Sequence, residues 1–179
     1  MTTVPNTLWH PCEAADHGAR PATRRVVIHT IEGTAAGALS WFANRQRVET
    51  TGAQLVIGLD HAYQTMNLDH IAWHARNANH DGVGVEHEGS ANDRKRVWLS
   101  KRKRKQLRMS ANRVAWICYH YRMGRPSKGH NVFGHRDIPG NDHVDPDAHP
   151  PLGFPWLFYM LLCRRAYKNL VNSGGRKWS

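Results

Sequence analysis

The chain has 179 residues, of which 40% are hydrophobic and seven are tryptophan, and this composition excludes a disordered polymer and predicts one folded domain. The formal net charge of +11 favours a polyanionic partner: nucleic acid, an anionic cell wall or a membrane surface. The three cysteines include no CxxC pair, which argues against a disulfide framework and against a thiolate zinc cluster.

Two features of the sequence bear on targeting and on membrane insertion. Residues 1–16 have no basic start followed by an apolar run, so we expect no secretory signal and synthesis in the cytoplasm. The longest apolar run, residues 152–163, is too short to cross ~30 Å of hydrocarbon.

The first half of the chain predicts two kinds of element in alternation. The β-branched residues of segment 24–30 predict a strand. Residues 34–48 predict a helix with Thr34 as its N-cap. The apolar segments 54–60 and 62–66 are separated by a polar pair, so they predict a hairpin.

The second half predicts one further strand and two helices. Segment 82–89 is a glycine-rich strand, which indicates that another backbone or a ligand lies close to it. Residues 100–123 predict a long helix, and residues from about 155 to 172 predict a final helix. The residues expected to face inward from the long helix are Leu107, Val114, Ile117, Cys118 and Tyr121.

These elements predict an α/β fold with a single mixed β-sheet flanked by helices. We expect residues 25–172 to form the main domain, with residues 1–24 packed on it as an N-terminal segment and residues 173–179 as a C-terminal tail.

The densest charge run is KRKRKQLR at residues 101–108, preceded by RKRVW at residues 94–98. One interpretation is a solvated helix face. The other is a basic surface that binds an anionic polymer, since successive like charges repel each other on a helix unless a partner neutralises them. The sequence leaves both interpretations open.

A group of histidines and aspartates points to metal chemistry. His29 ends the first strand and shares a face with Val27, and the irregular segment 134–146 contains no serine or cysteine nucleophile. His29, His135 and Asp145 offer two imidazoles and one carboxylate, which leaves the fourth position of a tetrahedral zinc open. Zinc lowers the pKa of bound water to ~7, so such a site needs no side-chain nucleophile.

A hydrolase of this kind also needs a proton acceptor and a donor to the developing oxyanion. Glu86 and Glu88 lie on the same face of strand 82–89, so alternation leaves both carboxylates open as the acceptor. His143, two residues before Asp145, would project near the metal as a donor.

Five motifs in order carry a resemblance over residues 25–158: VIHTIEG, AWHARNAN, VGVEHEGS, FGHRDIPG and DHVDP. Together they resemble the zinc-dependent N-acetylmuramoyl-L-alanine amidases of the amidase-2 type. That family includes bacteriophage endolysin amidases, cytoplasmic muropeptide-recycling amidases and the peptidoglycan recognition proteins. The resemblance implies their fold.

The resemblance assigns roles residue by residue. It implies that His29, His135 and Asp145 are the zinc ligands and that Glu86, rather than Glu88, is the catalytic carboxylate. His143 stands where many members have a lysine that helps to stabilise the transition state.

The resemblance also points to the substrate cleft. His74 matches a family histidine near the cleft that is not a ligand. Its neighbour Trp73 either stacks on a sugar or fills the core. Some members use a tyrosine beside the metal, and the matching position here is Ala53, which favours the route through Glu86.

Two departures from the family pattern bear on the site. A histidine at position 143 titrates near neutrality where a lysine stays charged, so the pH profile is expected to differ. The segment DPDAHPPLGFPW is longer than the family's DPGxxFPW, so Asp147 or His149 competes with Asp145 as the third ligand.

The implied function is zinc-dependent hydrolysis of the amide between N-acetylmuramic acid and L-alanine in peptidoglycan, by a phage or prophage lysis enzyme acting on the bacterial cell wall. We expect anionic peptidoglycan as the partner, a monomer, no nucleic acid and no membrane span. The alternatives are a non-catalytic peptidoglycan-binding module and a cytoplasmic muropeptide-recycling amidase. A nucleic-acid-binding protein ranks below these, because it leaves the His/His/Asp set unexplained.

Overall fold

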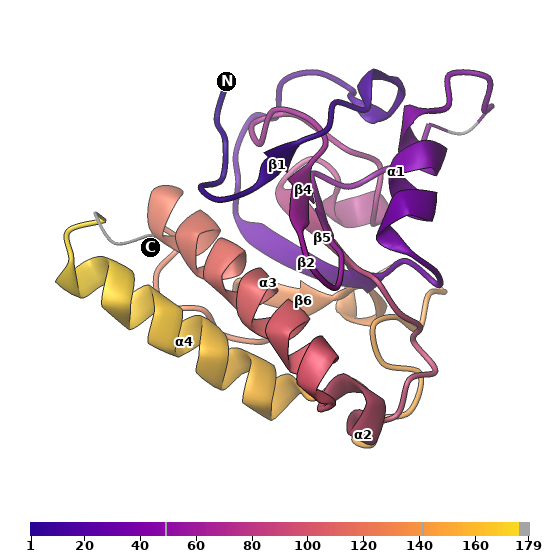
Figure 1. The fold of residues 1–179 in the computed structure, drawn as a ribbon. Helices are drawn as coiled ribbons and strands as arrows, with labels where there is room; N and C mark the ends of the chain where they lie inside the picture. The colour runs from indigo at the N-terminus through magenta and orange to yellow at the C-terminus, as the bar shows by residue number, and fades with distance from the viewer. Residues whose placement is uncertain (49, 141, 176–179) are drawn as a thin grey trace.

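The computed structural model describes residues 1–48, 50–140 and 142–175, and within these residues six strands form one sheet (Figure 1). The sheet order is β1-β4-β3-β5-β2-β6. Strands β3 and β4 pair antiparallel and the other neighbours pair in parallel, which confirms the predicted mixed sheet. The strands are β1 (Leu8–Trp9), β2 (Arg25–Thr30), β3 (Leu55–Ile57), β4 (Ala62–Gln64), β5 (Gly82–His87) and β6 (Val132–Gly134).

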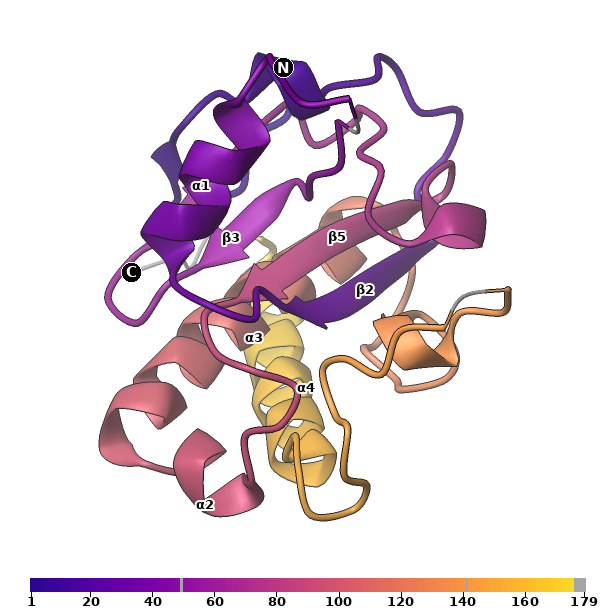
Figure 2. The same cartoon turned by 90° about the vertical axis from the view of Figure 1, so that its right-hand side faces the viewer.

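Helices cover both faces of the sheet. Helix α1 lies on one face, and α3 and α4 pack side by side on the other (Figures 1 and 2). In the described part of the chain, no helix combines the length and apolar character that crossing a bilayer requires. The helices are α1 (Ala35–Ala43), α2 (Lys95–Trp98), α3 (Lys101–His120) and α4 (Trp156–Asn172), with single 3-10 turns η1 (Glu13–Ala15), η2 (Arg76–Ala78) and η3 (His135–Asp137).

Alternation along β2 and β5 makes the two faces of the sheet chemically different. On one face, branched side chains pack with α3 and α4 in one core cluster; those from β2 and β5 are Val26, Ile28, Val83 and Val85. On the other face, Val27 packs with Ala75 and Ala78. Because successive strand residues point to opposite faces, His29 and Glu86 fall on the face of Val27, away from α3 and α4.

Helix α1 begins as predicted and ends earlier than predicted. The Thr34 hydroxyl accepts a hydrogen bond from the Gly37 amide at 3.2 Å, so Thr34 is the N-cap. The expected continuation through residues 44–48 is wrong. The Trp41 carbonyl, which a longer helix would use internally, accepts a hydrogen bond from the Arg47 guanidinium at 2.9 Å.

Strands β2 and β5, the β3–β4 hairpin and helices α3 and α4 lie where the sequence predicted them. Of the residues expected inward on α3, Tyr121 is only half-buried, and its hydroxyl donates to Asp69 at 2.6 Å. Strands β1 and β6 were not predicted. They are two and three residues long, which is too short for a period-2 pattern to appear.

The N-terminal segment lies along the edge of the sheet. Strand β1 pairs with β4, and the amide of the buried Val4 donates to Gln64 Oε1 at 2.8 Å. The division into residues 1–24, 25–172 and 173–179 stays a prediction. Residues 176–179 of the expected tail lie outside the described residues.

A buried polar chain crosses from the sheet to the helices behind it. His87 Nδ1 lies 3.1 Å from the His29 carbonyl, and His87 Nε2 lies 2.7 Å from the Ser110 hydroxyl, which in turn lies 2.7 Å from the Tyr159 hydroxyl. A carbonyl only accepts, so Nδ1 carries the proton and Nε2 accepts from Ser110. Burial lowers the pKa of His87 to about 3, which keeps the ring neutral in this chain.

Candidate metal centre and catalytic cleft

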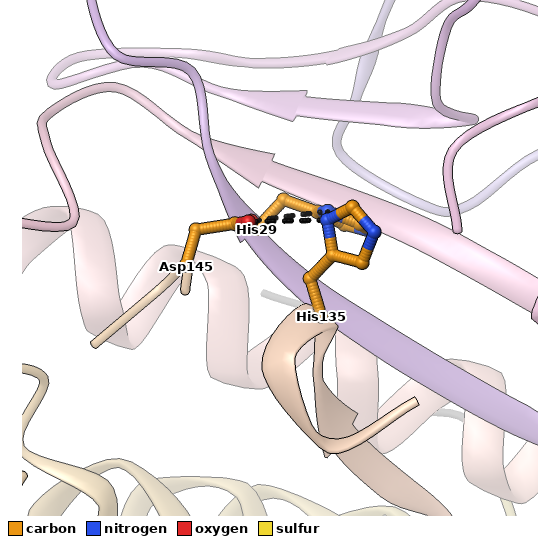
Figure 3. A group of neighbouring side chains, drawn as sticks. All are labelled: His29, His135 and Asp145. Atoms are coloured by element: carbon orange, nitrogen blue, oxygen red, sulfur yellow. Dashed lines mark hydrogen bonds and ion pairs between the residues drawn. The ribbon is translucent and has the colours of Figure 1, made fainter. Parts of the chain in front are cut away.

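Strand pairing brings the two central histidines together. The parallel register of β2 and β6 sets Ile28 beside Gly134, so the next residues, His29 and His135, emerge at the same end of the sheet. Asp145 arrives from the loop that follows η3. Figure 3 shows the three side chains converging from these three segments.

The distances within this group suit a zinc ion. The Nδ1 atoms of His29 and His135 are 3.1 Å apart, and the two oxygens of Asp145 lie 3.2 Å and 3.1 Å from them respectively. Two nitrogens bound to one tetrahedral zinc, at bond lengths of ~2.0–2.1 Å, would be about 3.3 Å apart. All three side chains are buried, and their donor atoms lie within 4.8 Å of one another. Both the donor chemistry and the spacing therefore fit zinc.

The protonation of the group also favours a cation. Burial lowers the pKa of His29, and the neighbouring Asp145 only partly offsets this, so His29 is neutral and has a lone pair to give. Burial opposes the charge on Asp145, but the neighbouring imidazoles of His135 and His29 hold its pKa well below the usual range. A neutral imidazole and an ionised carboxylate are the forms that bind metals.

His74 sets which nitrogen of His29 is free. His74 Nε2 lies 3.4 Å from the Gly82 carbonyl, which can only accept, so Nε2 carries the proton. His74 Nδ1 then accepts from His29 Nε2 at 3.1 Å. His29 Nδ1 is left without a proton and faces Asp145. A partner that fixes the tautomer of a ligand histidine is a usual feature of metal sites.

A glycine in β5 makes room for this arrangement. A Cβ atom at Gly84 would come within 2.8 Å of His74 Cγ. The close neighbour at Gly84 is therefore a side chain, whereas the sequence predicted a backbone or a ligand. A close backbone lies instead at Gly82, where a Cβ atom would come within 2.5 Å of the Ala78 carbonyl oxygen.

Glu86 lies beside the histidines and has an unpaired oxygen. It is the β5 partner of His29 in the sheet register. Its Oε2 atom is buried and has no hydrogen-bond partner among the described residues. Burial, followed by the negative charges of Asp145 and Glu32, raises the pKa of Glu86 to about 8.

Glu88 serves a different purpose, although it shares a strand face with Glu86. Its Oε2 atom accepts a hydrogen bond from the Ala35 amide at 3.1 Å, at the first turn of α1. An acidic side chain at that position stabilises a helix N-terminus. Of the two carboxylates that alternation left open, Glu86 is the one that lines the cavity holding the histidines.

His143 stands at the rim of the group. Its ring stacks on His135 at 4.2 Å between centroids, and its Nδ1 is 3.6 Å from Asp145 Oδ1. The side chain is 58% exposed, so it can reach a bound substrate as well as the carboxylate.

The longer segment after Asp145 does not displace Asp145 from the histidines. Asp147 is buried, and its Oδ1 atom accepts from the His149 amide at 3.0 Å. Neither Asp147 nor His149 belongs to the group of converging donor atoms, which contains Asp145.

The group opens into a cavity of about 640 Å³. Trp73 and His74 line it together with Glu86 and His143. Trp73 is 46% exposed and stacks on His17 at 3.9 Å between centroids, so it is a cleft residue rather than a core residue. No motif in the sequence marked His17 as a cleft residue.

A second cavity, of about 390 Å³, adjoins the first on the α1 side and shares Glu32 and Glu86 with it. Sequence reasoning missed Glu32. Its backbone has φ of 56°, and its carboxylate accepts hydrogen bonds from the Ala91 amide at 2.6 Å and the Ser90 hydroxyl at 2.7 Å. The only sequence signal for it was the turn IEG after the first strand.

Comparison with known proteins gives the same family as the sequence motifs. A model of the N-acetylmuramoyl-L-alanine amidase family matches residues 18–148. The chain is also 28% identical over 181 residues to N-acetylmuramoyl-L-alanine amidase A of Achromobacter lyticus, and the match covers 94% of each chain.

Solved structures share the fold. A selenomethionine derivative of AmpD matches 89% of this chain and 96% of its own, with a TM-score of 0.72 and 19% identity. The Staphylococcus aureus hydrolase AmiA in complex with its ligand matches 99% of this chain and 90% of its own, with a TM-score of 0.68 and 16% identity. The catalytic domain of XlyA matches 88% of this chain and 99% of its own, with a TM-score of 0.63 and 15% identity.

Proposed function

The chain belongs to the N-acetylmuramoyl-L-alanine amidase family, and from this we propose a zinc-dependent mechanism in which each residue of the cleft has a distinct role. The chain is a peptidoglycan amidase, which hydrolyses the amide between N-acetylmuramic acid and L-alanine. His29, His135 and Asp145 would hold the ion. The observation that carries this proposal is the convergence of these three buried donors at 3.1–3.2 Å.

When bound, zinc supplies a Lewis acid and lowers the pKa of water. The protein's own contribution to this site is positional. The hydrogen bond between His29 and His74 fixes the tautomer of His29, and the Thr30 amide lies 3.4 Å from Asp145 Oδ2. Such supporting hydrogen bonds hold ligands in place and preserve their basicity.

Glu86 would act as the general base. Its unpaired Oε2 atom is free to accept the proton of a water molecule in the cavity. A base with a raised pKa holds that proton firmly enough to return it to the leaving amine of L-alanine. The burial that raises the pKa therefore serves both halves of the reaction.

His143 would steady the oxyanion of the tetrahedral intermediate. It lies at the cavity rim beside His135, and it is exposed enough to move toward a substrate. A single hydrogen-bond donor to the oxyanion typically contributes ~10²–10³-fold to the rate. Trp73 and His74, on the other wall of the cavity, would contact the substrate.

We infer that the enzyme acts on intact wall as a phage or prophage lysis enzyme. The support is its charge: a formal +11 suits an anionic wall, whereas a soluble muropeptide needs no basic platform. A muropeptide-recycling amidase is the alternative. A binding module without activity is disfavoured by the complete set of His29, His135, Asp145 and Glu86.

Two measurements on the purified protein test this function. Metal analysis should find one zinc per chain, and mass spectrometry of digested walls should find stem peptides released with a free L-alanine amine. Intact walls and a soluble muropeptide should be compared as substrates. A strong preference for the soluble muropeptide would favour recycling over lysis, and an absence of zinc in an active preparation would contradict the metal assignment.

A further inference from the structure

On the outward face of α4, exposed leucines lie near the N-terminal end of the helix and cationic residues lie further along it. Leu157 and Leu161 are 77% and 55% exposed, although leucine is a residue that folding normally buries. Further along the helix, at the same angular position, come Arg164, Arg165 and Lys168, because residues three, four, seven and eleven apart share a helical face. One stripe therefore presents leucines first and cations afterwards.

The segments that surround this stripe are strongly basic in sequence. Residues 94–136 and 148–179, which include α2, α3 and α4, contain no aspartate or glutamate, although they hold most of the 25 lysines and arginines of the chain. The acidic residues that reach this layer come from neighbouring segments: Asp60 pairs with Arg102 and Lys105, and Asp137 pairs with Lys128. Helices α3 and α4, which lie together on one face of the sheet (Figure 1), thus present a mainly cationic surface, and exposed leucines lie on α4.

An apolar hollow continues the leucine end of the stripe. A cavity of about 360 Å³ beside the first turn of α4 is lined mainly by apolar residues and prolines, together with one cation and one carboxylate: Leu99, Pro150, Pro151, Phe154, Pro155, Trp156, Leu157, Phe158, Lys95 and Asp147. Leu152, in the same loop, is 58% exposed. Two isolated exposed leucines would be ordinary for a protein surface. Here the leucines belong to a larger, contiguous apolar area.

We propose that this face of α4, with the hollow beside it, binds the surface of an anionic lipid bilayer. An anionic wall polymer or a nucleic acid would use the cations and leave the leucines in water. A second copy of the chain would cover the leucines but would bring two strongly cationic surfaces together. A bilayer with anionic headgroups accepts both features, since leucines enter the headgroup boundary while lysine and arginine contact the headgroups.

Such binding leaves the catalytic cleft free. His29 and Glu86 lie on the opposite face of the sheet from α3 and α4, with Val27 and α1 (Figure 2). A bilayer on the outer side of α4 would thus meet the face of the molecule that does not carry the cleft.

The proposal can be tested by sedimentation of the native protein with vesicles of equal parts phosphatidylglycerol and phosphatidylcholine, and with vesicles of phosphatidylcholine alone. The native chain should bind the first and not the second. Leu157→Ser with Leu161→Ser should weaken binding about tenfold or more, because two leucines lose their apolar contact. Leu8→Ser, which removes a leucine that is 50% exposed on β1, is the matched control and should bind as the native chain does.

Hydrolysis of a soluble muropeptide should be unchanged in all of these variants, which separates this proposal from the assignment of the enzyme. Absence of binding to the phosphatidylglycerol vesicles would overturn the proposal. Full binding by the leucine variant, with loss in Arg165→Gln and Lys168→Gln, would mean purely electrostatic attraction to polyanions and would also overturn it. A dimer in sedimentation velocity that the leucine substitutions abolish would identify a second copy of the chain as the true partner.

Discussion

The Nδ1 atoms of His29 and His135 face each other across 3.1 Å, with one oxygen of Asp145 beside each of them. Two imidazolium rings could not approach so closely, since both would present a proton and a positive charge. The arrangement requires that at least one lone pair points into the space between the rings. This relationship underlies the first two predictions.

Removal of a ligand should remove the metal. His29→Ala should lose both stoichiometric zinc and amidase activity, because two remaining donors hold zinc weakly. Zinc content by atomic absorption and release of stem peptide are the two measurements. Asp147→Asn is the matched control, since Asp147 is buried close by in the chain but outside the donor group. Retention of zinc and activity by His29→Ala would remove His29 from the site.

Loss of the tautomer-fixing partner should weaken zinc binding without abolishing it. In the native chain, His29 Nε2 donates to His74 Nδ1 at 3.1 Å. His74→Ala leaves all three ligands in place but removes this acceptor. Zinc affinity, measured by competition with a chelating dye, should fall ~10–100-fold. An unchanged affinity would show that His74 acts on the substrate alone.

Replacement of the proposed base should separate binding from chemistry. Glu86→Gln should keep its zinc and lower kcat ~10²–10⁴-fold, as loss of a general base does. Glu88→Gln is the control, because Glu88 contacts the Ala35 amide instead of the cavity. If Glu88→Gln loses the activity and Glu86→Gln keeps it, the roles of the two carboxylates are reversed.

Glu86 should also affect how the free energy of unfolding of the metal-free protein depends on pH. Its pKa is raised to about 8 by burial, whereas an unfolded glutamate has a pKa of ~4.3. A carboxyl with the higher pKa in the folded state stabilises the fold while protonated, and this contribution is lost as the pH rises through about 8. Urea unfolding with a chelator present should therefore show the native chain losing more stability between about pH 5 and pH 9 than Glu86→Gln. Parallel pH curves for the native chain and Glu86→Gln would show that burial does not raise the pKa of Glu86.

The basic run on α3 should divide into structural and exposed members. Lys103 is buried, donates to the Glu88 carbonyl and lies 4.4 Å from the Trp98 ring centroid, so Lys103→Met should cost about 1–3 kcal/mol in urea unfolding. Lys101→Gln with Arg104→Gln should stay within about 0.5 kcal/mol, as exposed substitutions usually do. The exposed pair should instead lower lysis of intact walls and spare a soluble muropeptide. Equal losses on both substrates would indicate damage to the cleft.

The sequence predicted the main strands, the long helices and the converging residues because those features repeat over many positions or occur as motifs. It could not predict β6, whose three residues become a strand only because β2 lies beside them. It could not separate Lys103 from its neighbours in KRKRK, since the burial of one lysine depends on where Trp98 packs. The choice between Glu86 and Glu88 depended likewise on the position of α1, which alternation along a strand does not report.

The chain from His87 through Ser110 to Tyr159 has a consequence for how this domain tolerates change. Ser110 is the central member, because its hydroxyl contacts both His87 Nε2 and the Tyr159 hydroxyl. Replacement of Ser110 alone by an apolar residue removes the partner of the buried His87 Nε2, whereas a joint replacement of all three by apolar residues of similar volume removes these polar atoms together. The three positions should therefore behave as one epistatic unit. Variation among them should be tolerated in combination far better than one position at a time, and it should be felt at His29, whose backbone they hold from behind.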